Sequence, residues 1–191
     1  MGERLIKNSI AAELFEWLEM AVLSACAVLL IFTFILRPAR VDGHSMDYTL
    51  ADGQMLLLSD IGYRPKYGDI VVFQKINAER NEPIVKRVIA TAGQTVDIDF
   101  DTWQVTVTDA DGTALVYDES AYVNHPLGER MRAGDMTYPL TVGENQVFVM
   151  GDNRNNSLDS RYSTIGLVNR DEIIGKVFLR FFPLNKIGLV H

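Results

Sequence analysis

The residues in this sequence best suited to chemistry lie in three short segments: Ser45, Lys86 and the polar stretch 151–161. A serine hydroxyl becomes a strong nucleophile when a neighbouring base removes its proton. Lys86 stands in an apolar run, and burial there would favour the neutral amine, which is a competent general base near pH 7. The combination predicts acyl transfer by a serine nucleophile with a lysine base.

Simpler interpretations remain open for Ser45 and Lys86. A serine in a loop that comes after a long apolar stretch is typical of a solvated turn or a helix cap. Neighbouring residues on a strand point to opposite sides of the sheet, so Lys86 would face water if Val85 faced inward. Residue types alone therefore leave the pairing as a hypothesis.

The stretch 151–161 reads Gly-Asp-Asn-Arg-Asn-Asn-Ser-Leu-Asp-Ser-Arg. It is typical of a hydrophilic loop, but it contains two acid–arginine pairs at short range, Asp152 with Arg154 and Asp159 with Arg161. Charge-assisted hydrogen bonds within such pairs can brace a loop rather than merely solvate it.

A histidine is the alternative base, because His44 adjoins Ser45. Sequence neighbours in an extended chain diverge, whereas the base of a serine triad must reach the hydroxyl oxygen. The other histidines, His125 and His191, lie in an irregular region and at the end of the sequence. Three histidines without cysteine partners also argue against a structural zinc site, and we expect neither a metal nor an organic cofactor.

The segment that precedes Ser45 is apolar. No charge occurs from Met20 to Leu36, and extension back to Trp17, past Glu19, gives about twenty residues, the length of a membrane-spanning helix. A cleavable signal should be shorter and end in small residues, whereas this run ends in Leu36, Arg37 and Pro38. A buried core helix remains the alternative, and an interfacial helix suits residues 1–16 better than the run itself. We expect one uncleaved anchor.

After Arg40 the pattern changes to short β-branched and aromatic runs separated by turn signals such as Asp52-Gly53. Periodicity predicts strands at 55–59, 69–74, 84–91, 95–98, 103–108, 146–150 and 173–182. The region 101–143 is more polar and less regular, and is expected to form an inserted cap. The part after the anchor is therefore predicted to be mainly β, without a βαβ pattern.

Charge and cysteine content exclude some classes of protein. The formal net charge is −7, which argues against nucleic-acid binding, because that binding depends on cationic contacts to phosphate. The one cysteine, Cys26, lies inside the apolar run, so no disulfide is expected in the rest of the chain.

The order of an apolar anchor, a Ser-Met motif, a Lys-Arg strand and a Gly-Asp-Asn-Arg loop resembles that of type I signal peptidases. Four segments carry the resemblance in the family's order: Ser45-Met46-x-x-Thr49-Leu50, Tyr67 to Phe73, Lys86-Arg87-Val88-Ile89, and Gly151 to Arg161. The resemblance covers nearly the whole chain and is closest to members with a single N-terminal anchor.

The resemblance implies a serine endopeptidase that removes signal peptides through an acyl-enzyme. Ser45 would be the nucleophile and Lys86 the general base, and Ser157 would hydrogen-bond and orient the lysine amine. Asp159 and Arg161 would hold the loop, with Asp152 and Arg154 in support. Small side chains of the substrate would enter two shallow apolar pockets, with walls supplied by Met46, Val85 and Val88.

The resemblance also implies an arrangement in the membrane. Residues 1–16 would be a cytoplasmic segment, 17–36 a transmembrane helix, and 37–191 an extracytoplasmic catalytic β-domain with the inserted cap at about 101–143. Expected partners are signal-peptide-bearing preproteins, membrane lipid and the export machinery, with no nucleic acid, and the expected state is a monomer. The alternative function is a catalytically silent, membrane-anchored relative that acts as a chaperone or pilus-assembly factor.

Two positions depart from the family pattern near the nucleophile. Tyr48 stands where the family usually has proline, so the turn after Ser45 lacks proline's fixed φ. Gly43 stands where some members carry a serine that completes the oxyanion hole, so the main chain, water or another donor would share that role.

Overall fold

The structure is a computed structural model that describes residues 2–75 and 82–190, with side chains described from residue 12 onward except for residue 34. The chain divides into two compact units, Met1–Arg37 and Pro38–His191. The first is helical and the second is built from antiparallel strands.

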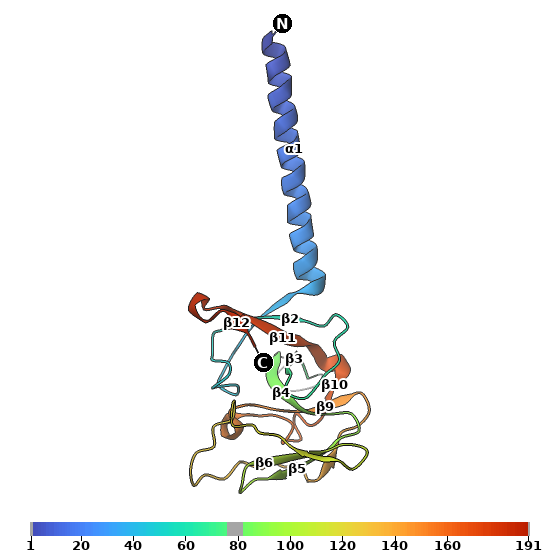
Figure 1. Ribbon diagram of the computed structural model, residues 1–191, viewed down its shortest axis with the longest axis vertical. Helices are drawn as coiled ribbons and strands as arrows, with labels where there is room; N and C mark the ends of the chain where they lie inside the picture. The colour runs from blue at the N-terminus through green and yellow to red at the C-terminus, as the bar shows by residue number, and fades with distance from the viewer. Residues whose placement is uncertain (1, 76–81, 191) are drawn as a thin grey trace. The chain divides into compact units, whose positions relative to one another are not determined.

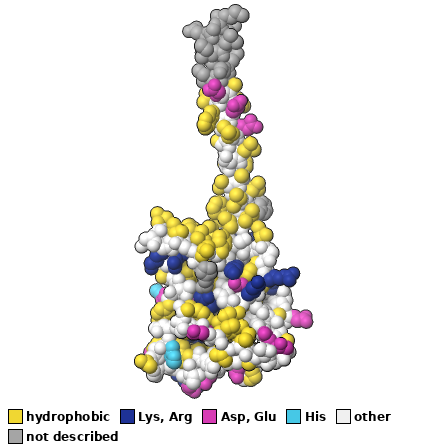
Figure 2. Space-filling view, viewed as in Figure 1, with side chains coloured by type: hydrophobic (Ala, Val, Ile, Leu, Met, Phe, Trp, Pro, Cys, Tyr) yellow, Lys and Arg dark blue, Asp and Glu magenta, His cyan; other side chains and the backbone are white. Residues whose placement is uncertain are grey.

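The first unit is one helix, α1 (Gly2–Leu30), continued by a π-helical turn, η1 (Ile31–Ile35). Its segment Ala12–Thr33 has a mean hydropathy of 2.0 and is exposed along its length. By length and composition this segment can cross a membrane. Figure 2 shows hydrophobic side chains (yellow) over much of the described helix surface, with acidic side chains toward its N-terminal end.

The second unit contains two antiparallel sheets (Figure 1). The larger has the strand order β1-β2-β11-β3-β4-β9-β10, and β12 pairs with β11. Its strands are β1 (Arg37–Arg40), β2 (Met55–Ser59), β3 (Ile70–Phe73), β4 (Ile84–Thr91), β9 (Gln146–Met150), β10 (Val168–Asn169), β11 (Ile173–Phe182) and β12 (Gly188–Leu189). The smaller has the order β7-β6-β5-β8, made of β5 (Thr95–Asp99), β6 (Gln104–Thr108), β7 (Ala114–Val116) and β8 (Leu140–Thr141).

The described part of the second unit also contains three short 3₁₀ helices, η2 (Arg154–Asn156), η3 (Arg170–Glu172) and η4 (Leu184–Lys186). The first lies inside the polar stretch 151–161 and turns the chain back after β9. In η3, Asn169 and Glu172 form a reciprocal capping box, which satisfies backbone donors that a short helix leaves free.

The burial pattern of the strands depends on their place in the larger sheet. On β2, Leu56 and Leu58 are buried while the alternating residues are partly exposed. All of β3 is buried, because β11 and β4 flank it and side chains cover both of its faces. Burial on both faces removes the alternation that marks a half-exposed strand. β4 is likewise buried through most of its length.

Three apolar clusters fill the second unit. One joins the two sheets, since Phe148 and Met150 of β9 pack with Val96 and Val107 of the smaller sheet. A second packs the chain just before and after Ser45 against β2, and includes Val41 and Leu50. The third lies around β3, β4 and β9. The Ser45 turn is therefore anchored in a cluster that it shares with β2, β3 and β11.

The prediction of a mainly β, antiparallel fold after a long apolar helix is confirmed. The bounds predicted for β2, β4, β9 and β11 match the structure. The short strands β1, β7, β8, β10 and β12 were not predicted from the sequence. The strands predicted at 95–98 and 103–108 correspond to β5 and β6, which lie together in the smaller sheet.

Candidate active site

Ser45 lies in a turn held by contacts on both sides. The side chain of Met46 is buried in the cluster that contains Leu50, and the main-chain N–H of Leu50 donates to the Met46 carbonyl. The amide N–H of Asn153 donates to the Ser45 carbonyl at 3.0 Å, and the Asn153 side chain donates to the His44 carbonyl. These bonds join the Ser45 turn directly to the stretch 151–161.

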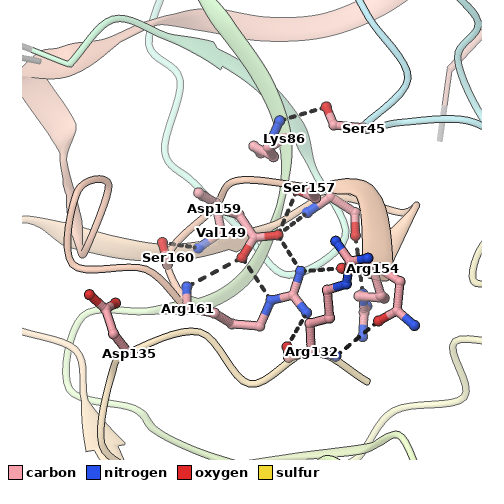
Figure 3. A network of polar contacts seen from close by, with 12 residues as sticks. Ser45, Lys86, Arg132, Asp135, Val149, Arg154, Ser157, Asp159, Ser160 and Arg161 are labelled. Carbon is pink, nitrogen blue, oxygen red and sulfur yellow. Dashed lines mark hydrogen bonds and ion pairs between the residues drawn. The ribbon is translucent and has the colours of Figure 1, made fainter. Parts of the chain in front are cut away.

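Lys86 lies on β4, 41 residues further along the chain, and its side chain points at Ser45 (Figure 3). Its Nζ donates to Ser45 Oγ at 2.7 Å and to the Val85 carbonyl at 2.9 Å. Only 2% of the residue is exposed, so the interpretation in which Lys86 faces water is wrong. Val85, its neighbour, is the half-exposed one.

Burial changes the acidity of the Lys86 amine. Desolvation lowers its pKa from 10.5 to about 8 and outweighs the carboxylates of Asp159 and Asp152, which raise it. The guanidinium of Arg161 lowers it further. A minor fraction of the amine is therefore neutral just above pH 7, and half of it at about pH 8, beside a serine hydroxyl.

Asp159 organises the loop beneath this pair. Its carboxylate accepts bonds from the Gly151 main-chain N–H at 3.0 Å, from Ser157 Oγ at 2.7 Å, and from Nε and Nη2 of Arg161 at 2.8 and 2.9 Å. Burial by itself raises the pKa of Asp159, but the bonds from Arg161 and its charge outweigh burial and lower it. The predicted pairing of Asp159 with Arg161 is confirmed.

Ser157 differs from its expected arrangement. Within the described residues, the hydrogen-bond partners of the Lys86 amine are Ser45 and Val85, and the Ser157 hydroxyl donates instead to Asp159. A carboxylate is the stronger acceptor, and it lies two residues away on the same loop. Gly151 separates Ser157 from the Ser45 main chain, since a Cβ built on Gly151 would meet both Ser157 Oγ and the Ser45 carbonyl oxygen.

The predicted pairing of Asp152 with Arg154 is wrong. Asp152 accepts a bidentate contact from Arg87, with both N···O distances 2.8 Å, and a further bond from Thr49. Arg154 instead forms an ion pair with Glu119, at 2.7 Å between Nη1 and Oε2. Each buried charge takes its partner from a segment that is distant in sequence, which spacing within the loop cannot reveal.

A cleft of about 370 Å³ lies in front of Ser45 and Lys86. Met46 and Val85 line it, and Leu158 and Ile84 add apolar surface. Val88 does not line the cleft. It is fully buried in the cluster around β3, β4 and β9, because it lies further along β4 where β9 covers the strand.

His44 and His125 each contact a group other than the Ser45 hydroxyl, and His191 lies outside the described residues. His44 Nδ1 lies 3.0 Å from Asp47 Oδ2 on the exposed side of the turn. The ring of His125 packs against Trp103, with ring centroids 4.8 Å apart. Among the residues for which side chains are described, no group of three or more His, Cys, Asp or Glu residues is arranged to hold a metal ion.

Tyr48 adopts φ of +84°, in the left-handed region. Proline has φ near −65° and cannot adopt this conformation. The backbone at position 48 is therefore incompatible with the proline that the resemblance led us to expect there. The exposed Tyr48 ring is tethered at its hydroxyl, which accepts a bond from the Asn124 side chain at 3.0 Å.

Three residues near the site were not singled out from the sequence: Glu119, Tyr122 and Asn124. All come from the irregular region between β7 and β8, where neither periodicity nor a motif marks them. Only their contacts with Arg154, Arg87 and Tyr48 identify them.

Comparison with known proteins identifies related chains. The family model described as "Signal peptidase, peptidase S26" matches residues 14–182. Signal peptidase I of Bacillus licheniformis is 35% identical over 184 residues, which cover 95% of this chain and 93% of that protein. Signal peptidase IB of Staphylococcus aureus is 32% identical over 185 residues, covering 91% and 92%. A crystal structure of a signal peptidase I from Enterococcus faecalis aligns with a TM-score of 0.46 at 30% identity, over 60% of this chain and 97% of that one.

The family model and the two signal peptidases that are similar in sequence define a serine hydrolase. The chain belongs to the peptidase S26 family of signal peptidases, as the resemblance of its motifs predicted. In its general form, the activity that goes with this family is the removal of signal peptides by a serine protease.

Proposed function

We propose that this chain cleaves signal peptides from preproteins by a Ser45/Lys86 dyad through an acyl-enzyme. The observation that carries the proposal is the 2.7 Å contact between Lys86 Nζ and Ser45 Oγ, made by an amine that is almost fully buried. Burial favours the neutral form of the amine, and the contact places that amine within reach of the serine proton.

The proton and bond changes use groups of this chain and water. Neutral Lys86 takes the proton from Ser45 Oγ as that oxygen forms a bond to the scissile carbonyl carbon. The tetrahedral intermediate collapses, the C–N bond breaks, and the Lys86 ammonium returns its proton to the leaving amine. Water then attacks the ester, Lys86 accepts a water proton, and that proton returns to Ser45 Oγ as the acid product leaves.

The main-chain N–H of Ser45 is the proposed donor to the developing oxyanion. It donates to no acceptor within the described part of the chain, whereas the Ser45 carbonyl is already bonded to Asn153. A free N–H on the nucleophile's own residue can be aimed at the oxyanion of the bound ester without rearrangement of the turn.

The substrate is proposed to lie in the cleft between the Ser45 turn and β4. Met46 and Val85 line this cleft and are candidates for the walls that admit small side chains before the cut. The export machinery would present the preprotein to a monomeric enzyme.

The membrane arrangement is part of the same proposal. Residues 1–16 would be cytoplasmic, 17–36 would span the bilayer, and 37–191 would lie outside, with the cap inserted in the last segment. The exposed, apolar Ala12–Thr33 segment supports the anchor, which would tether the enzyme to the membrane from which a signal peptide emerges.

The test is cleavage of a precursor that carries an Ala-x-Ala site by detergent-solubilised, full-length protein, with the masses of the fragments as the readout. Wild type should cut after the second alanine, whereas Ser45→Ala and Lys86→Ala should be inactive. Ser120→Ala and Lys66→Ala remove an exposed serine and an exposed lysine and should retain full activity. A folded wild type that is as inert as Ser45→Ala on several precursors would overturn the proposal in favour of a silent assembly factor.

A further inference from the structure

Residues 117–124, here called the bracing segment, cross from β7 toward β8 without forming a strand. Their burial is selective. Glu119 is buried and Tyr122 is half-buried, whereas Asp118, Ser120 and Ala121 between and beside them are exposed. An acidic side chain is seldom buried unless it is paired, so Glu119 marks a specific contact.

Glu119 makes that contact with Arg154. The Arg154 side chain is fully inaccessible to solvent, and its Nη1 lies 2.7 Å from Glu119 Oε2. Arg154 Nε also donates to the Gly151 carbonyl at 3.1 Å, and the Arg154 carbonyl accepts a bond from Arg161 Nη2 at 2.6 Å. The bracing segment therefore supplies the counter-charge for an arginine inside the loop that carries Ser157 and Asp159.

Tyr122 makes a second contact, with Arg87. The Arg87 guanidinium carbon lies 3.9 Å above the centre of the Tyr122 ring. The Tyr122 hydroxyl donates to Glu119 at 2.9 Å and lies 2.8 Å from the Tyr67 hydroxyl, so the ring is held at its far end. A cation over an aromatic face is attracted most strongly where water is excluded, as it is at this buried arginine.

Asn124 makes the third contact. Its side-chain amide donates at 3.0 Å to the hydroxyl of Tyr48, which lies three residues after Ser45. Arg87 is linked to the same turn, because its bidentate partner Asp152 accepts a bond from Thr49 at 2.5 Å.

The three contacts converge on the elements that hold Ser45 and Lys86. Arg87 is the next residue after Lys86 on β4, Arg154 lies in the loop beneath the pair, and Tyr48 lies in the Ser45 turn. We propose that the bracing segment positions the Ser45–Lys86 pair, and that Glu119 and Tyr122 are positioning residues that act through Arg154 and Arg87. The effect on catalysis rests on the proposed function, whereas the effect on the position of Ser45 and Lys86 does not.

The test compares four variants of the full-length protein with wild type. Tyr122→Leu removes the ring, Tyr122→Phe keeps the ring and removes the hydroxyl, Glu119→Gln removes the charge, and Asn124→Ala removes the bond to Tyr48. Asp118→Asn removes an exposed charge from the same segment and is the matched control. The measurements are kcat and KM on the precursor, the midpoint of thermal unfolding, and hydrogen exchange of the amides at residues 45–50.

Tyr122→Leu and Glu119→Gln should lower kcat by about tenfold to a hundredfold with KM within about twofold of wild type. Amides of the Ser45 turn should exchange faster in both variants, while amides of β5 and β6 exchange as in wild type. Tyr122→Phe should recover most of kcat, since the ring remains over Arg87, and Asp118→Asn should match wild type.

Other outcomes overturn the inference. If kcat in each variant falls only as far as the fraction of folded protein falls, the segment is structural only. If Tyr122→Phe is as impaired as Tyr122→Leu, the ring over Arg87 does not position the pair. Asn124→Ala breaks one exposed hydrogen bond and leaves every charge paired. It should therefore fold as wild type and exchange faster at residues 45–50, which keeps the test decisive should Glu119→Gln fail to fold. An inactive wild type would count against the Ser45/Lys86 mechanism, whereas unchanged exchange at residues 45–50 would count against the bracing segment.

Discussion

Lys86 and Arg87 are consecutive residues of β4, and each is only 2% exposed, yet the pKa shifts of their side chains have opposite directions. Arg87 has the Asp152 carboxylate at 2.8 Å and keeps its charge, with its pKa raised. Within the described residues Lys86 has no carboxylate in ion-pair contact, so desolvation lowers the pKa of its amine. Because the two side chains leave the strand on opposite sides, one strand supplies both a permanent cation and a base.

The pH dependence of catalysis should track the Lys86 amine. Since its pKa is lowered to about 8, kcat/KM should rise with pH up to about 8 and become level above it, as the neutral form of Lys86 becomes the main one. Initial rates on the precursor between pH 6 and 10 measure this. Lys86→Arg should be inactive throughout, because a guanidinium does not lose its proton in this range. A midpoint near 10.5 would contradict a desolvated lysine.

Lys86 should reduce stability at neutral pH. Its folded-state pKa lies below its unfolded value of 10.5, so below about pH 8 both states hold the proton and the full cost of burying the charge is present. That cost is about 3 kcal/mol and falls as pH rises from about 8 to 10.5. Lys86→Met should therefore be inactive yet more stable at pH 7, by up to about 3 kcal/mol in denaturant unfolding.

The control is the pH dependence of the difference in free energy of unfolding between wild type and Lys86→Met. Comparison of wild type with Lys86→Met at each pH cancels the titration of other groups. The gain in stability should shrink toward zero as pH approaches 10.5. An equal gain at pH 7 and pH 10.5 would mean that improved packing, rather than removal of a buried charge, causes it.

Gly151 should not tolerate even alanine. An added Cβ would lie 2.5 Å from the Ser45 carbonyl oxygen and would also meet Ser157 Oγ. The Ser45 main chain must then move, and displacement of a nucleophile by about 1 Å can lower the rate about a hundredfold. Gly151→Ala should therefore lose at least about tenfold in kcat. Gly188→Ala, with open space around its Cβ, is the matched control and should leave kcat unchanged.

Tyr48 should tolerate glycine but not proline. Glycine adopts φ of +84° without cost, so Tyr48→Gly relieves the backbone strain while it loses the bond to Asn124, and its free energy of unfolding should stay within about 1 kcal/mol of wild type. Tyr48→Pro requires a negative φ and should lower that free energy by more than about 1 kcal/mol and reduce kcat. A fully active, stable Tyr48→Pro variant would show that the turn takes another path in solution.

The fold could be predicted where strands are long and their composition distinctive. β2, β4, β9 and β11 each carry five or more residues rich in β-branched, leucine or aromatic side chains, and their bounds can be read from composition and turn signals. β8, β10 and β12 contain two residues each, which is too short for any period to appear. They form because a neighbouring strand presents backbone N–H and C=O groups for hydrogen bonding. The position of that neighbour is set by the assembled sheet.

The sequence by itself determined the long apolar helix, the antiparallel β character of the chain after it, and the order of the four motifs, because each depends on local composition and spacing. Only the tertiary structure decided which charges meet. Asp152 pairs with Arg87, 65 residues away, and Arg154 pairs with Glu119 from the irregular region. A buried charge is costly without a counter-charge, and the fold supplies each partner from a distant segment. The burial of Lys86 was decided in the same way, since it depends on what covers β4 and not on the residues beside it.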